Sequence, residues 1–298
     1  MPNTLGKAVT IDVFAQAFID ALEAKTVPLR FFTKDFSSEV AVKGASVTTQ
    51  VVSGGTSART KTDQYGTYID DDSAMIDVTV TLDNHLYKQL RFSNVELAKA
   101  GQSYYDRFGK TNAEAMSRGI QTDLHARITN ANFSNSFTCA ASAFNYDKLV
   151  ELSTQASNLN WPTDSRVVVL KPSYTEGLKK DAKVLSLFSK TAELMAVDGY
   201  IGKLAGFEVF ETNSIESAYS AEFVGYAAIP SAIAIAARLV ATPESAKQVM
   251  NTKSVESSNG LSMDQSVYFD ANSGQEKIRW ELLMGSKKAD GNALIRIK

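Results

Sequence analysis

Apolar residues near the start of the chain recur at helical spacing. Four of them lie three and four positions apart, as on one face of a helix: Ile11, Phe14, Phe18 and Leu22. Thr10 is a suitable cap for this helix, and Pro28 ends it. The pattern predicts an amphipathic helix whose apolar face packs against another part of the protein.

The pattern then changes to an alternation of period two that is typical of strands. Residues 37–73 contain no Leu, Phe, Met or Trp, and Val47, Thr49 and Val51 alternate with polar neighbours. Ile76 to Leu82 alternates in the same way. This predicts a long two-stranded excursion with too little apolar surface to be stable alone. It is either a mobile loop or an arm supported by a partner molecule, and we favour the arm.

A long helix is predicted after this excursion. Ser93 to Glu96 has the pattern of a capping box. Beyond Gly101, six apolar residues keep near-helical spacing: Tyr105, Phe108, Met116, Ile120, Leu124 and Ile128. About 28 residues of helix would span roughly 40 Å, which suits a structural spine.

Residues 144–241 alternate between helical and strand patterns. Helices are expected over 146–159, 174–181 and 186–197, and the continuous apolar run Arg166–Leu170 predicts a strand buried on both faces. The glycine-punctuated segment 199–206 is expected to be a loop that enters a strand at 207–212. Two further apolar strands flank Pro230.

The C-terminal pattern predicts a β meander. Val267 and Phe269 lead into a turn at 270–274. After this turn Ile278, Trp280, Leu282 and Met284 face one way, while Arg279 and Glu281 face the other. A second turn at 290–291 precedes alternation to the end of the chain.

Composition narrows the class of protein. The chain has 298 residues, 44% hydrophobic and 21% charged, as expected of a globular protein. Its 31 basic and 33 acidic residues give a net charge of −2, which argues against a dedicated nucleic-acid binder. Cys139 is the only cysteine, which excludes an internal disulfide framework. No secretory signal is expected, and Pro230 and Arg238 interrupt the most apolar stretch, so no membrane span is predicted.

The sequence contains fragments of chemical motifs, but none is complete. Residues 109–111 (Gly-Lys-Thr) match the end of a phosphate-binding loop. The motif requires a glycine at position 104, which is Tyr, and a preceding strand, which is not predicted. His85 and His125 lie on different elements, and we expect surface or interface positions for both. The acidic segments 70–72 and 270–274 lack calcium-loop spacing and are expected to be turns.

Nucleophile and dinucleotide motifs are equally incomplete. No Gly-x-Ser-x-Gly elbow occurs, and Cys139 is expected to be a small buried hydrophobe. The glycines at 199, 202 and 206 have the wrong spacing for a dinucleotide fingerprint. We therefore predict no catalytic, cofactor-binding or metal-ligating residues, no cofactor and no enzyme activity.

Several segments, taken in order, resemble the major capsid proteins of tailed bacteriophages with the Hong Kong 97-type fold. The strand Arg166–Leu170 followed by Pro172 is similar to the first strand of that family's axial domain. The segment 199–213 is similar to the loop that enters its next strand, and the Ala-Ile-Ala run before Arg238 resembles its strand pair. Met284–Lys287 is similar to its closing strands.

The resemblance implies an α+β fold with five parts. These are an N-terminal arm and helix (1–36), an extended β-hairpin loop (37–92), the spine helix of a peripheral domain (93–134), an α/β axial domain (135–245), and C-terminal strands that complete the peripheral domain (246–298). The implied function is structural: hexamers and pentamers form an icosahedral shell around double-stranded DNA.

The resemblance also implies partners and a location. The partners are other copies of the chain, a portal protein at one vertex, a separate scaffolding protein, a possible decoration protein, and packaged DNA in non-specific proximity. The shell would be assembled in the bacterial cytoplasm and reside in the virion, without a membrane. Two alternatives stay open: an encapsulin-type compartment shell, and a small-molecule enzyme with a β insertion.

Overall fold

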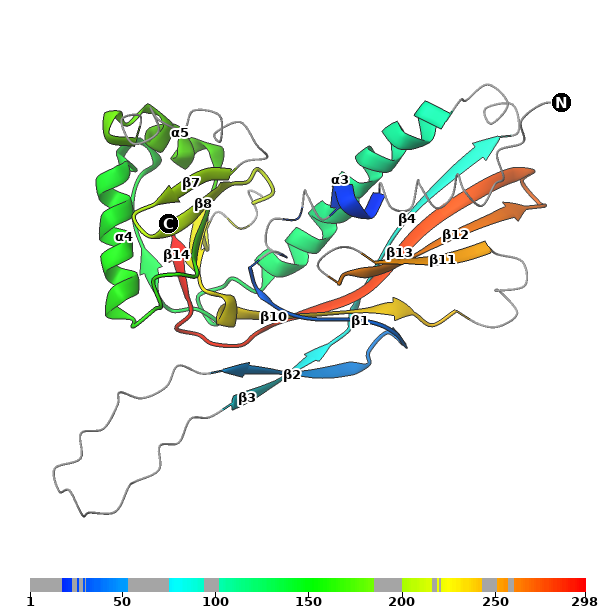
Figure 1. The fold of residues 1–298 in the computed structure, drawn as a ribbon, viewed down its shortest axis with the longest axis horizontal. Coiled ribbons are helices and arrows are strands. Elements are labelled where there is room, and N and C mark those ends of the chain that lie inside the picture. Colours follow the sequence, from blue (N-terminus) through cyan, green and yellow to red (C-terminus); the bar gives the residue numbers. More distant parts are fainter. Residues whose placement is uncertain are drawn as a thin grey trace, which may run out of the picture.

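The computed structural model describes residues 18–22, 26, 29, 31–52, 75–93, 102–184, 200–215, 219, 221–242, 251–256 and 260–298. Within these ranges the chain builds two six-stranded sheets, each with helices on a face, and a separate two-stranded hairpin (Figure 1). The first sheet and the long helix α3 (Gln102–Ala126) form the elongated part of the molecule. The second sheet carries helices α4 (Tyr146–Asn158) and α5 (Pro172–Lys180).

The first sheet is organised around its longest strand, β13 (Gln275–Lys288). One edge of β13 pairs with β4, and the other pairs first with β12 and then with β10. At the borders of the sheet, β11 pairs with β12 and β1 runs parallel to β10. The bounds of these neighbours are β1 Thr33–Ala41, β4 Asn84–Ser93, β10 Ile233–Val240, β11 Asn251–Glu256 and β12 Ser262–Asp270.

Helix α3 and residues 18–22 cover the apolar face of this sheet. Phe18 stacks on Trp280 with ring centroids 4.6 Å apart, and Met116, Ile120 and Leu124 of α3 are buried in the same core. The predicted helical pattern is confirmed where these residues are described. Ile11, Phe14, Tyr105 and Phe108, which the sequence also placed on buried helix faces, lie outside the described side chains.

The predicted capping box at residues 93–96 stays a prediction. Ser93 is the last residue of strand β4, where it pairs with Gln275 of β13, and the described part of α3 begins at Gln102. Residues 94–101, which contain the rest of the predicted helix start, lie outside the described residues.

The second sheet has the order β5-β14-β9-β6-β8-β7. Its strands are β5 Ser136–Phe137, β6 Arg166–Leu170, β7 Tyr200–Leu204, β8 Phe207–Glu211, β9 Gly225–Ala228 and β14 Leu294–Ile297. Every residue of β6 is buried, as its continuous apolar run predicted. The expected helix over 186–197 lies outside the described residues.

Residues 200–206 do not form the predicted loop. Residues 200–204 form β7, which pairs antiparallel with β8. The two residues between these strands, Ala205 and Gly206, both have positive φ, at 49° and 86°. Two such residues between antiparallel strands make a tight hairpin turn. Gly206 adopts the positive φ that this turn requires, so the two strands are joined by two residues and not by a longer loop.

The last strand also departs from its expected place. Strands β12 and β13 belong to the first sheet, but β14 pairs with β9 and β5 of the second. The expectation that all C-terminal strands complete one unit is therefore wrong for residues 294–297. Side chains on both faces of β14 are buried in this position, and Leu294 and Ile295 belong to two different hydrophobic cores.

Candidate assembly surface

The hairpin of β2 (Ser46–Val52) and β3 (Met75–Thr81) confirms the predicted two-stranded excursion. It projects from the first sheet below β10 in Figure 1. The prediction that the hairpin lacks support within its own chain is wrong at its base, which packs on the first sheet. Val51, Val78, Val80 and Leu82 are buried against Ala234, Ala236 and Leu283 of the sheet. The sequence missed this contact because the sheet residues that cover the hairpin lie far away in the chain.

Backbone contacts fix this base further. The turn before β2 is closed by hydrogen bonds from Gly44 N–H to the Leu82 carbonyl, at 2.9 Å, and from Leu82 N–H to the Ala45 carbonyl, at 2.8 Å. Lys287 Nζ donates to the Thr79 carbonyl at 3.0 Å. The acidic segment 70–72 lies outside the described residues. The orientation of the hairpin is therefore set by its own chain.

We expect Gly285→Ala to lift the hairpin base off the sheet. A Cβ at position 285 would lie 2.0 Å from the Thr81 backbone oxygen, so the strands must separate. Overpacking of this kind costs about 1–3 kcal/mol. Urea unfolding of the subunit measures the loss, and limited proteolysis between β2 and β3 should accelerate. Gly119→Ala is the comparison, because a Cβ there meets only the end of the Leu86 side chain, at 3.3 Å, and the backbone of Gly119 does not have a positive φ.

An ion pair holds the strand that leads into the hairpin. Arg238 of β10 donates through Nη1 to the Asp35 carbonyl and through Nη2 to Asp35 Oδ1, both at 2.7 Å. The Arg238 side chain is only 9% exposed. Buried charges are stable only when paired, so this contact ties β1 to β10.

A second buried arginine ties the segment after α3 to the second sheet. Arg296 of β14 donates through Nε to the Phe133 carbonyl at 2.7 Å, through Nη1 to Glu222 Oε2 at 3.1 Å, and through Nη2 to Asn130 Oδ1. Glu222 also accepts a hydrogen bond from the Asn130 N–H at 2.8 Å. The segment after α3 is thereby tied to the second sheet.

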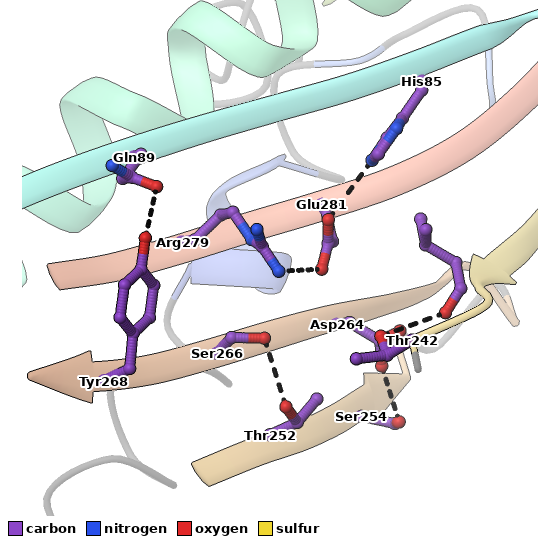
Figure 2. A network of polar contacts seen from close by, with 11 residues as sticks. His85, Gln89, Thr242, Thr252, Ser254, Asp264, Ser266, Tyr268, Arg279 and Glu281 are labelled. Atoms are coloured by element: carbon purple, nitrogen blue, oxygen red, sulfur yellow. Dashed lines mark hydrogen bonds and ion pairs between the residues drawn. The ribbon is translucent and has the colours of Figure 1, made fainter. Parts of the chain in front are cut away.

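Beyond the part that the hairpin covers, the face of the first sheet opposite α3 is polar, and its side chains form two rows across β4, β13, β12 and β11 (Figure 2). One row contains Gln89, Arg279, Ser266 and Thr252 at paired positions. The neighbouring row contains Tyr87, Glu281, Asp264 and Ser254. The alternation along β13 predicted an outward direction for Arg279 and Glu281, but it did not predict that Glu281 would be buried.

Two carboxylates of this face lie directly opposite each other. Glu281 accepts from Arg279 Nη2 at 2.9 Å and is 3.2 Å from His85 Nε2 (Figure 2). Asp264 accepts from the Ser254 hydroxyl at 2.7 Å. Burial raises the pKa of Asp264, and the nearby charge of Glu281 adds to this effect, while the Ser254 hydrogen bond opposes it.

The two histidines differ in environment. His85 is partly exposed beside Glu281, which agrees with a surface position. His125 is buried near the end of α3, so its predicted surface position is wrong. Its ring meets those of Tyr219, Phe223 and Tyr226 edge-on, with centroids 5.7–6.3 Å apart. Burial lowers the pKa of His125 to about 4, opposed by a backbone hydrogen bond at Ser214.

We expect His125 to make the subunit acid-sensitive. Its folded-state pKa of about 4 lies below the ordinary value of 6.5, so the unfolded chain binds the extra proton between these values. The contribution of His125 to the free energy of unfolding has its full value above pH 6.5. It is lost progressively as the pH falls toward 4, by about 3 kcal/mol in total. Urea unfolding at pH 7 and pH 5 measures the slope. In His125→Phe this part of the slope should vanish, and an unchanged slope would contradict the assignment.

The remaining motif fragments that the structure describes lie on separate elements. Residues 109–111 lie inside α3, and burial raises the pKa of the Cys139 thiol. Asp270 closes the turn between β12 and β13, and Lys277 Nζ at 2.5 Å holds the pKa of Asp270 at about 2. Among the described residues, no three His, Cys, Asp or Glu side chains form a group that could hold a metal ion. No helix in the described ranges is long and apolar enough to cross a membrane.

The arrangement of two sheets, a long helix and a projecting hairpin defines the Hong Kong 97-type capsid fold, as the resemblance implied. The structure is similar to "Capsid of Ralstonia phage GP4", with a TM-score of 0.55, 11% sequence identity, and coverage of 89% of this chain and 86% of that one. It is also similar to "Capsid structure of the Cyanophage P-SCSP1u", with a TM-score of 0.53, 14% identity, and coverage of 89% and 85%.

A third similar structure is described as a virus-like particle from Pyrococcus furiosus. Its TM-score is 0.52 and its identity 9%, and the match covers 95% of this chain and 96% of that one. At such low identity these likenesses define the fold alone. The sequence itself matches no known family model and no curated protein.

Proposed function

We propose that this protein is the major capsid protein of a tailed bacteriophage, which assembles as hexamers and pentamers into an icosahedral shell around double-stranded DNA. The likeness to phage capsids over most of both chains carries the proposal. The projecting hairpin supports it, because an arm anchored at its base is suited to reaching a neighbouring copy. The role is structural and not enzymatic.

The proposal assigns a role to each part of the chain. Residues 37–92 are the extended loop that reaches the adjacent subunit, and 93–134 are the spine of the peripheral domain. Residues 135–245, together with the last strand β14, are the axial domain. This domain contacts its copies around the symmetry axes. Residues 1–36 are the N-terminal arm and helix, and the rest of 246–298 completes the peripheral domain.

The proposed partners are a portal protein, a separate scaffolding protein, a decoration protein and packaged DNA. The net charge of −2 favours weak contact with DNA, because strong adhesion would oppose packaging and release. Assembly would take place in the bacterial cytoplasm, and the finished shell would be part of the virion.

A compartment shell of the encapsulin type is the second candidate. The similarity to the virus-like particle from Pyrococcus furiosus favours it, since that match covers nearly all of both chains. Such a shell would enclose an enzyme in place of DNA. Neighbouring terminase and portal genes would support the phage, whereas a neighbouring cargo enzyme with a docking tail would support the compartment.

Sedimentation of the recombinant protein, followed by negative-stain imaging of the fast fraction, tests the proposal. It is run with the protein alone and with its neighbouring gene products. Closed hollow particles of uniform size are the expected result. A slow monomer or dimer under every condition would overturn the shell function and return attention to the enzyme alternative.

A further inference from the structure

A cavity of about 510 Å³ opens where strand β10 ends beside β11 and β12. Its apolar wall is formed by Val40, Leu239 and Val240, and its polar wall by hydroxyls and one carboxylate, that of Asp264. Val40 is 62% exposed, so the apolar wall continues to the surface. The cavity therefore joins an apolar entrance to an acidic interior.

Asp264 differs from its neighbour Glu281 in its partners. Both carboxylates are buried, at 4% and 3% exposure. Glu281 is paired with Arg279 and lies beside His85, whereas in the described part of the chain no cation lies within 4 Å of Asp264 (Figure 2). Its partners there are the Ser254 hydroxyl and a backbone hydrogen bond from Val240. A buried carboxylate is costly unless a cation compensates it.

The shape and chemistry of the cavity fit the side chain of a lysine. Its aliphatic stem can lie along Val40 and Leu239, while the ammonium group reaches the carboxylate. Ser254 already occupies Oδ1 of Asp264. A compact ammonium needs a single acceptor, whereas the guanidinium fork of arginine is suited to both oxygens of a carboxylate.

We propose that the Asp264 cavity receives a lysine from a second copy of this chain and forms a specific contact between subunits. The inference rests on the proposed shell function, because in a shell every copy has neighbours of the same chain at its surface. Charge complementarity supports this occupant. In the described chain the charge of Arg279 acts on Asp264 without forming an ion pair with it, so the cavity offers a buried acid whose charge is not directly paired.

Zero-length cross-linking tests the contact in the wild-type protein. Isotope-labelled and unlabelled subunits are mixed, assembled and treated with a carbodiimide, which joins carboxylates to adjacent amines. Mass spectrometry should find Asp264 linked to a lysine in peptides of mixed labelling, in particles and not in free subunits. Links confined to a single chain would overturn the proposal. So would particles whose inter-chain links never include Asp264.

A matched pair of variants gives the second test. Asp264→Asn keeps the size of the side chain and its bond to Ser254 but removes the charge. We expect it to raise the concentration needed for half-maximal assembly about tenfold or more, with subunit unfolding little changed. Asp270→Asn, which removes a charge at the partly buried turn that ends the same strand, should assemble like wild type. Equal assembly of both variants would overturn the inference, whereas failure of the wild type to form particles would instead overturn the shell function.

Discussion

Replacing residues 53–74 by Asn-Gly is expected to give a folded subunit that forms no closed particles. Val52 and Met75 are paired at the end of the hairpin, so a two-residue turn can join them directly. The contacts that anchor the base, at Val51, Val78 and Val80, remain in the shortened chain. Only the part that we propose to reach a neighbouring subunit is removed.

Two measurements separate folding from assembly in this variant. Thermal unfolding of the subunit should shift by no more than a few degrees, and sedimentation should show a slow species under conditions in which the wild type forms particles. A variant with a Gly/Ser segment of the original length is the matched control, and it should also fail to assemble. Normal particles from the Asn-Gly variant would refute the role of this segment in assembly.

The elements that the sequence predicted well are those with strong local periodicity. The strand Arg166–Leu170 was predicted with its observed bounds, because a short apolar run flanked by polar residues has few alternatives. The strand pairs at the C-terminus and in the hairpin also follow from alternation of period two. In these segments, burial against the sheet and local propensity favour the same conformation.

The features that the sequence did not predict depend on contacts between distant residues. The alternation around Leu294 indicates a strand but not which of two sheets accepts it. The sequence around Thr81 does not indicate that its backbone packs closely against Gly285 at the base of the hairpin. The buried state of His125 arises from aromatic rings of a segment nearly a hundred residues later. No local sequence pattern indicates which distant residues will be in contact.

The candidate cavity was missed for the same reason. Glu281 lies between Trp280 and Leu282, and Asp264 follows Met263, which indicates ordinary outward positions for both carboxylates. Their burial, and the difference in their partners, becomes visible only when β4, β11 and the end of β10 surround them. A buried acid is recognised from its three-dimensional environment and not from its neighbours in sequence.

Arg296→Met is expected to cost about 1–3 kcal/mol of folding free energy, because it leaves a buried backbone acceptor without its donor. Arg296 is 1% exposed, and its guanidinium donates to the buried Phe133 carbonyl, to the Glu222 carboxylate and to the Asn130 side chain. Met fills a similar volume but donates no hydrogen bond. Water can replace the lost donor at Glu222, whose side chain is 40% exposed, and at the exposed Asn130, but not at the Phe133 carbonyl. Since domains are stable by only about 5–15 kcal/mol, this loss is a measurable share of the free energy of unfolding.

Arg296→Lys separates charge from geometry at this junction. A lysine keeps the positive charge, but its single ammonium cannot reproduce the planar fork that reaches three segments at once. We therefore expect an intermediate loss in urea unfolding, whereas Arg118→Met, an exposed arginine on α3, should change stability by less than about 0.5 kcal/mol. If Arg296→Met were as stable as Arg118→Met, the network would not hold the segment after α3 to the second sheet, and the apolar core would have to do so alone.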